Sequence, residues 1–129
     1  MGDKLHNETE LAGVVTLLKA LADPNRLQIL DLLMQGDSCN CELNERLGVP
    51  PNLLSHHLRI LREAGLVTSR RDAIDGRWIY YAVDREAITR WRTWFGDFFD
   101  PVRIRVRPRL CGPEGQQTAG EQTNIAHCS

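Results

Sequence analysis

Residues 51–67 read PNLLSHHLRILREAGLV, and this stretch decides the fold class. Leu54, Leu58 and Leu61 recur at helical spacing, which predicts a helix over residues 51–64 with one apolar side. That side should pack on the body of the domain, while the opposite side is polar. A short polar helix face of this kind can enter a major groove and contact base edges. The candidate DNA contacts on this helix are Asn52, Ser55, His56, Arg59 and Arg62.

The polar residues of this helix differ in what they can recognise. Arg59 can pair with guanine and Asn52 with adenine, whereas Ser55 and His56 can contact bases or phosphates. The adjacent His57 falls on the leucine side, so we predict that it is a buried histidine with a structural role.

Helical and turn signals flank this helix on both sides. Asp23-Pro24 ends one helix and starts the next, with Asp23 as N-cap. Asp75-Gly76 is a tight-turn signal between two β-rich segments, which predicts a two-stranded hairpin. The predicted helices cover about residues 11–22, 24–36, 40–47, 51–64 and 85–99, and the predicted strands cover 66–71 and 78–83.

This order of elements predicts a mostly helical α+β fold, the winged helix-turn-helix, with one β-hairpin as the wing. The wing carries Arg70, Arg71 and Arg77 around its tip, and we expect them to contact the neighbouring minor groove or the phosphate backbone. Residues 1–100 form the predicted DNA-binding and dimerisation domain. Residues 101–129 form a C-terminal extension, which we expect to be partly flexible.

Charge is distributed unevenly along the 129 residues, although the net charge is only −1. Residues 1–58 carry four Lys/Arg against eight Asp/Glu, whereas residues 59–109 carry twelve Arg against seven Asp/Glu. Phosphate binding depends on this local field. No apolar run approaches the length of a membrane helix and the N-terminus has no secretory core, so we expect a cytoplasmic protein without a membrane partner.

Four stretches of the sequence resemble the ArsR/SmtB family of metal-sensing repressors, over about residues 8–100. They are LADPNRLQIL at 21–30, CNCEL at 39–43, LSHHLRILREAGLV at 54–67 and GRWIYY at 76–81. The resemblance implies a homodimer built on the first and last helices, bound to a double-stranded operator of two half-sites and released by an inducer. The apolar stripe of the last helix agrees with a dimer, because so large a stripe favours a partner surface. This stripe consists of Ile88, Trp91, Phe95 and Phe98.

Cys39 and Cys41 form a Cys-x-Cys pair at the start of the third predicted helix. A helix N-terminus favours the thiolate form of cysteine over the thiol, and thiolates bind soft metal ions in preference to hard ones. In the family that it resembles, this pair is similar to the sites for arsenite and antimonite, or for cadmium and lead. The best-known arsenite pattern has a further Cys where this chain has Asn44. Because trivalent arsenic prefers three sulfurs, we expect a third thiolate from Cys111, with Cys128 as the second choice.

Other interpretations remain open at this point. A thiol redox-sensing repressor of the same fold, or a dimeric module that does not bind DNA, would also fit a chain of this kind. A zinc site on the last helix is rejected because residues 84–100 contain no His. An enzyme is not expected, because no oxyanion or phosphate loop is visible. We therefore expect no required cofactor, and an inducing soft metal or metalloid ion as the ligand.

Overall fold

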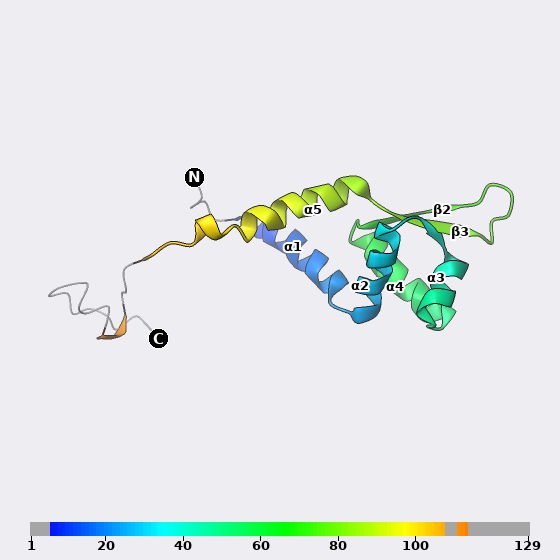
Figure 1. The fold of residues 1–129 in the computed structure, drawn as a ribbon, viewed down its shortest axis with the longest axis horizontal. Helices are drawn as coiled ribbons and strands as arrows, with labels where there is room; N and C mark the ends of the chain where they lie inside the picture. Colours follow the sequence, from blue (N-terminus) through cyan, green and yellow to red (C-terminus); the bar gives the residue numbers. More distant parts are fainter. Residues whose placement is uncertain (1–5, 108–110, 114–129) are drawn as a thin grey trace. The chain divides into compact units, whose positions relative to one another are not determined.

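The computed structural model describes residues 6–107 and 111–113, and the chain divides after Phe98 into two units. The first unit contains the helices and the sheet that carry the candidate sites (Figure 1). Its helices are α1 (Glu8–Leu21), α2 (Pro24–Met34), α3 (Asn40–Leu47), α4 (Pro51–Glu63) and α5 (Arg85–Phe98). Its strands are β1 (Ser38–Cys39), β2 (Val67–Arg71) and β3 (Ile79–Val83). The second unit begins with a short 3-10 helix, Pro101–Arg103.

Side-chain caps set where the first two helices begin. The Asn7 side chain accepts a hydrogen bond from the Glu10 backbone N–H at 2.7 Å, so α1 starts at Glu8, earlier than the apolar pattern predicts. The Asp23 carboxylate accepts from the backbone N–H groups of Asn25 and Arg26, at 2.8 and 3.2 Å, and thereby caps α2 as predicted.

The sheet has three antiparallel strands in the order β1-β3-β2. In the hairpin, Val67 is paired with Val83 and Arg71 with Ile79, which confirms the predicted wing. The sequence did not predict β1, in which Cys39 pairs with Tyr80. A strand of two residues has no alternation to detect, and its partner lies about 40 positions away in the chain.

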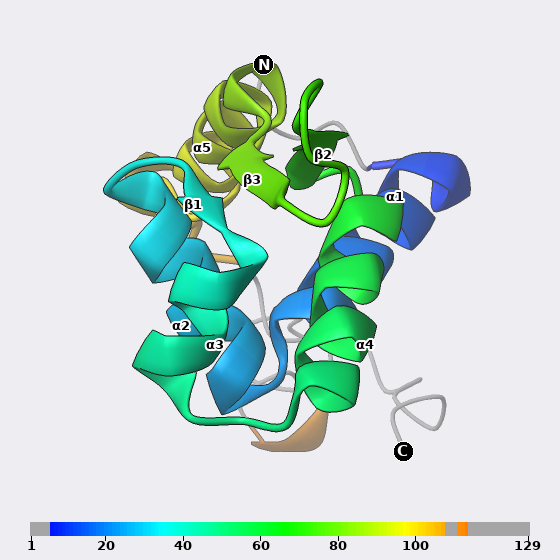
Figure 2. The same cartoon turned by 90° about the vertical axis from the view of Figure 1, so that its right-hand side faces the viewer.

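The core confirms the prediction that one side of α4 is apolar and buried. Leu54, Leu58 and Leu61 are buried and pack with leucines and isoleucines from α1, α2 and α3. Gly65, at φ +80°, follows the end of α4 and turns the chain toward β2. Viewed from the side of the hairpin tip, α3 and α4 are neighbours beneath the sheet (Figure 2). The buried leucine side of α4 therefore attaches this helix to the core.

Helix α5 presents a cluster of aromatic rings. Trp94 and Phe98 stack with their centroids 4.8 Å apart, and the Trp94 indole N–H donates to the Glu10 carboxylate on α1. Trp91 and Phe95 are half-buried against the core, whereas α1 leaves several aliphatic residues exposed. None of the described helices is long and apolar enough to cross a membrane.

Candidate nucleic-acid interface and thiol site

The polar face of α4 is open to solvent. All five candidate DNA contacts on this helix are exposed, namely Asn52, Ser55, His56, Arg59 and Arg62. A guanidinium can only donate hydrogen bonds, so the contact of 3.0 Å between Arg59 Nη2 and His56 Nδ1 makes that nitrogen the acceptor. The other ring nitrogen of His56 then carries the proton and can donate to a ligand. This face therefore offers both donors and acceptors to a duplex.

Helix α4 and the wing are joined by a direct contact. Arg62 Nη1 donates to Ser69 Oγ on β2 at 3.3 Å. On the same hairpin, the Arg70 guanidinium lies over the Tyr80 ring, 4.6 Å from its centroid. These contacts hold Arg62 and Arg70 against the hairpin, and neither contact places a carboxylate beside the guanidinium.

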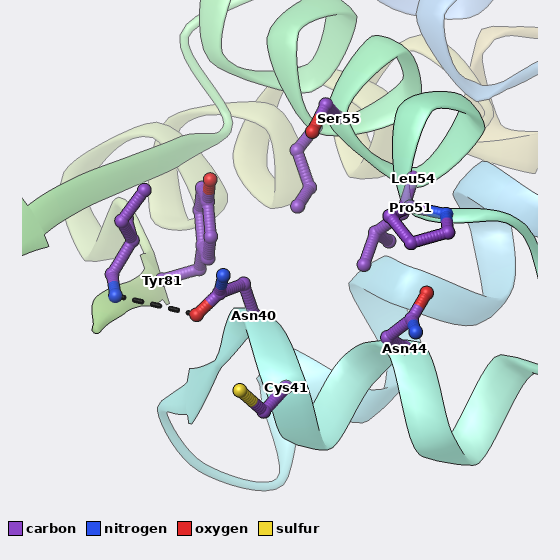
Figure 3. Close-up of a pocket in the computed structure, with 9 residues that line it drawn as sticks. Asn40, Cys41, Asn44, Pro51, Leu54, Ser55 and Tyr81 are labelled. Atoms are coloured by element: carbon purple, nitrogen blue, oxygen red, sulfur yellow. Dashed lines mark hydrogen bonds between the residues drawn. The ribbon is translucent and has the colours of Figure 1, made fainter. Parts of the chain in front are cut away.

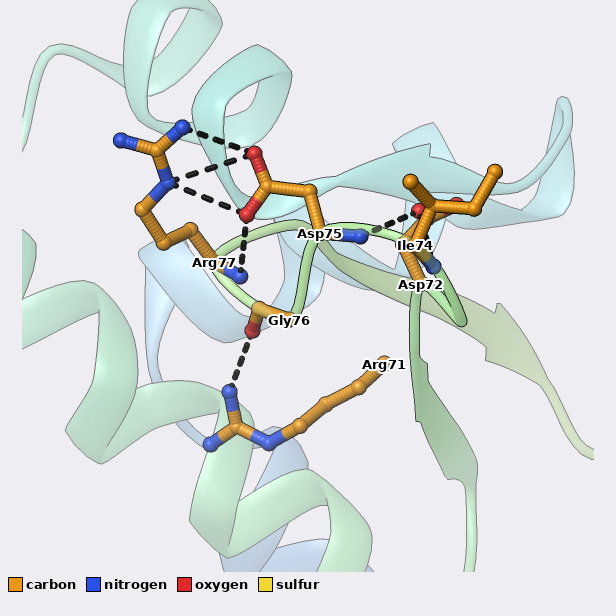
Figure 4. A network of polar contacts seen from close by, with 6 residues as sticks. All are labelled: Arg71, Asp72, Ile74, Asp75, Gly76 and Arg77. Atoms are coloured by element: carbon orange, nitrogen blue, oxygen red, sulfur yellow. Dashed lines mark hydrogen bonds and ion pairs between the residues drawn. The ribbon is translucent and has the colours of Figure 1, made fainter.

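The other two wing arginines are bound to the turn itself (Figure 4). Arg71 Nη1 donates to the Gly76 carbonyl at 2.6 Å, and Arg77 forms an ion pair with Asp75 at 2.8 Å. The Arg77 guanidinium and backbone hydrogen bonds hold the pKa of Asp75 below its usual range, and Asp75 raises the pKa of Arg77. Backbone N–H groups of Asp75 and Ile74 likewise lower the pKa of Asp72. The sequence predicted the position of Arg77 but not this pairing.

His57 is buried, as predicted, and its partners are residues that sequence reasoning did not connect to it. Arg26 Nη1 lies 3.1 Å from His57 Nδ1, while Arg26 Nε donates to the Ala20 carbonyl at 2.6 Å. Asp23 Oδ1 lies 4.0 Å from His57 Nε2. Burial lowers the pKa of His57, with further lowering by Arg26 and His56, against the opposing effect of Asp23. One arginine thus connects the end of α1 to α4.

The pKa of Asp23, the carboxylate in this network, is also shifted. Burial raises the pKa of Asp23, but hydrogen bonds from the Arg26 and Asn25 backbone, with the nearby His57 and Arg26 side chains, hold it below its usual value. The only sequence signal for the network is the Asp-Pro-Asn-Arg run at residues 23–26, which indicates a cap but not the contact with α4.

Both cysteines of the Cys-x-Cys pair are free thiols at the first turn of α3. Cys39 is the N-cap, and its Sγ accepts from the Glu42 backbone N–H at 3.4 Å. Cys41 is exposed. Within residues 6–107 and 111–113, no group of three or more His, Cys, Asp or Glu side chains could hold a metal ion. The described residues therefore supply no third ligand beside Cys39 and Cys41.

The two cysteines considered for the third position lie in the second unit. Cys111 is in a disulfide in this structure, so a role in metal binding would require its reduced form. Cys128 lies outside the described residues. The assignment of either one as a third ligand stays a prediction.

A hollow of about 250 Å³ lies between α3, α4 and β3 (Figure 3). Cys41 and Asn44 line it from α3, and Ser55 lines it from α4. Asn40 Oδ1 accepts from the Ile79 backbone N–H at 3.3 Å, which fixes the edge of β3. The Asn44 side-chain oxygen is buried without a hydrogen-bond partner among the described residues. One cysteine of the pair and one candidate DNA contact, Cys41 and Ser55, therefore line the same cavity.

Residues 23–69 match the family described as bacterial regulatory protein, arsR family. The chain is 32% identical over 84 residues to the transcriptional repressor SdpR of Bacillus subtilis, a match that spans 65% of this chain and 90% of SdpR. The chain belongs to the ArsR family. Members of the ArsR family are DNA-binding transcriptional regulators, so this protein is a regulator and not an enzyme.

Solved structures agree with the ArsR assignment. HlyU from Vibrio cholerae is 32% identical with a TM-score of 0.59, and the match covers 72% of this chain and 98% of HlyU. This likeness confirms the winged helix-turn-helix.

The chain is also 47% identical over 57 residues to the arsenical resistance operon repressor of Staphylococcus xylosus. That match spans 44% of this chain and only 55% of the repressor.

Proposed function

We propose that this ArsR-family protein is a cytoplasmic repressor that binds operator DNA as a homodimer and releases it when a soft metalloid binds its thiols. Arsenite or antimonite is the proposed inducer, with cadmium or lead as the alternative. The observation that carries the DNA-binding part is the exposed polar face of α4 above its buried leucines. The wing extends this face through the contact between Arg62 and Ser69.

The exposed apolar residues of α1 support the homodimer. Leu11, Val15 and Leu18 are 41, 46 and 48% exposed and recur at helical spacing along one side of α1. On α5, Phe98 is 36% exposed. Burying such a surface against a second copy would remove apolar area from water. A two-fold dimer would then present two α4 helices to half-sites about one helical turn apart.

The thiol pair supports sensing of a soft ion. Thiolate is the form that binds metal, and a helix N-terminus stabilises it. Thiolates select soft ions over Mg²⁺ or Ca²⁺. The relative from Staphylococcus xylosus is named an arsenical resistance operon repressor, which favours a metalloid over other soft ions. We propose Cys39 and Cys41 as two ligands and Cys111 as the third.

The shared hollow suggests how the ion would affect DNA binding. An ion on Cys41 would rearrange the first turn of α3, which faces Ser55 of the recognition helix across the cavity. Release requires that the ion bind more tightly to the protein conformation with low DNA affinity than to the conformation with high DNA affinity. Moving a two-state equilibrium from 1:99 to 99:1 takes roughly 5.5 kcal/mol of differential affinity.

The test is a titration of the reduced protein bound to a duplex that it has selected from a random pool. Arsenite is expected to release the wild-type protein, whereas the Cys39→Ser/Cys41→Ser variant should bind the duplex normally and not respond. A normal response of the variant would place the sensing site elsewhere. Release by peroxide but not by any of the four ions would favour the redox-sensing repressor. Sulfur-to-metal absorption would count the bound thiolates and identify the preferred ion.

A further inference from the structure

The turn of the wing spans residues 72–78, between β2 and β3. Arg77 is a candidate DNA contact in this turn, and its side chain is 88% exposed. Its Nε and Nη2 both face the Asp75 carboxylate, at 3.0 Å to Oδ1 and 2.8 Å to Oδ2 respectively. Two of the three guanidinium nitrogens are therefore already occupied by an anion in the free protein (Figure 4).

The Asp75 carboxylate is fixed by the turn as well as by Arg77. Asp75 Oδ1 accepts from the Arg77 backbone N–H at 3.1 Å, and the Asp75 backbone N–H donates to Asp72 Oδ2 at 2.9 Å. The Gly76 carbonyl, between these two residues, accepts from Arg71 at 2.6 Å. Because these bonds do not involve the Arg77 side chain, they would keep the carboxylate in place if that side chain moved to a phosphate.

We propose that Asp75 is an intramolecular competitor of DNA for Arg77, and that this competition sets the affinity of the wing. The inference rests on the proposed contact between the wing and DNA. Exposed ion pairs are weak, so a phosphate can displace the carboxylate. The pair therefore lowers the contribution of Arg77 to DNA binding without abolishing it.

A different arrangement would make Asp75 a support that orients Arg77 toward DNA. The two cases predict opposite results for Asp75→Asn, which removes the charge but keeps a side-chain oxygen for the Arg77 backbone N–H. Under competition, the variant binds DNA more tightly. Under orientation, it binds more weakly.

The experiment measures the affinity of the full chain for the selected duplex between 50 and 200 mM salt. We expect Asp75→Asn to raise affinity about fivefold for a dimer with two wings. For each additional phosphate that the variant neutralises, the slope of log binding constant against log salt concentration should become more negative by about 0.9. In an Arg77→Gln background, Asp75→Asn should have no effect. Asp31→Asn removes the same charge from an exposed position on α2 and is the matched control.

Three results would overturn the proposal: a loss or no change of affinity in Asp75→Asn, the same increase in the Arg77→Gln background, or no loss of affinity in Arg77→Gln alone. Thermal melts of each variant check that the turn is folded. An Arg59→Gln variant, measured beside them, separates this proposal from the function on which it rests. If that variant loses affinity while Asp75→Asn is unchanged, α4 contacts DNA and only the competition is wrong.

Discussion

Replacing Arg26 with Ala should destabilise the domain, although Arg26 lies outside the hydrophobic core. Its guanidinium donates to the Ala20 carbonyl at 2.6 Å, approaches His57 Nδ1 at 3.1 Å and reaches the Lys19 carbonyl at 3.4 Å. Hydrogen bonds to charged groups contribute about 1.5–3 kcal/mol each. Arg26 is half-buried and the third bond is long. We therefore take the two shorter bonds near the lower limit and expect a loss of about 3 kcal/mol.

Urea unfolding followed by circular dichroism measures this loss, at one pH and one protein concentration, because stability depends on pH and, if the protein dimerises, on concentration. For a domain of this size, about 3 kcal/mol corresponds to a fall in Tm on the order of 10 °C. Arg46→Ala, at an exposed position on α3, is the control and should stay within about 0.5 kcal/mol of the wild type. A loss below about 0.5 kcal/mol in Arg26→Ala would refute the claim that this arginine holds α1 to α4.

Two further predictions concern His57 and Arg59. Burial lowers the folded-state pKa of His57, so the unfolded chain binds its proton more tightly. The stability that neutral His57 supplies should be complete above about pH 6.5 and be lost as the pH falls toward the lower folded-state pKa. Urea unfolding between pH 7.5 and 5 should show this loss in the wild type and less of it in His57→Gln, and identical profiles would contradict it. Arg59→Gln should weaken binding to the selected duplex by about tenfold with no change in Tm, because the side chain is exposed. A fall in Tm would show that Arg59 supports the fold instead.

Local patterns were enough to predict the elements that position the candidate DNA interface. In α4, the spacing of Leu54, Leu58 and Leu61 determines both the helix and its open side, and burial of those leucines confirms it. The Asp75-Gly76 turn likewise places the wing. These signals are local because helical and hairpin geometry depends on residues close in the chain.

Contacts between distant residues could not be predicted in the same way. Strand β1 is too short for a pattern, and the bond between Arg26 and His57 joins positions 31 residues apart. The ion pair of Asp75 and Arg77 is local, but it depends on the turn geometry that brings a carboxylate back toward the second residue after it. Sequence alone therefore identified the wing arginines as cations without showing which are paired.

The central claim is that the polar face of α4 contacts base edges in the major groove. The most direct test measures the binding of wild-type and Arg59→Gln proteins to selected duplexes in which single guanines are replaced by 7-deazaguanine, which lacks the N7 acceptor. We predict that one position in each half-site weakens the wild type by about tenfold and leaves the variant almost unaffected, because the contact is already lost. Equal effects on both proteins at every guanine would contradict a contact between Arg59 and the major groove.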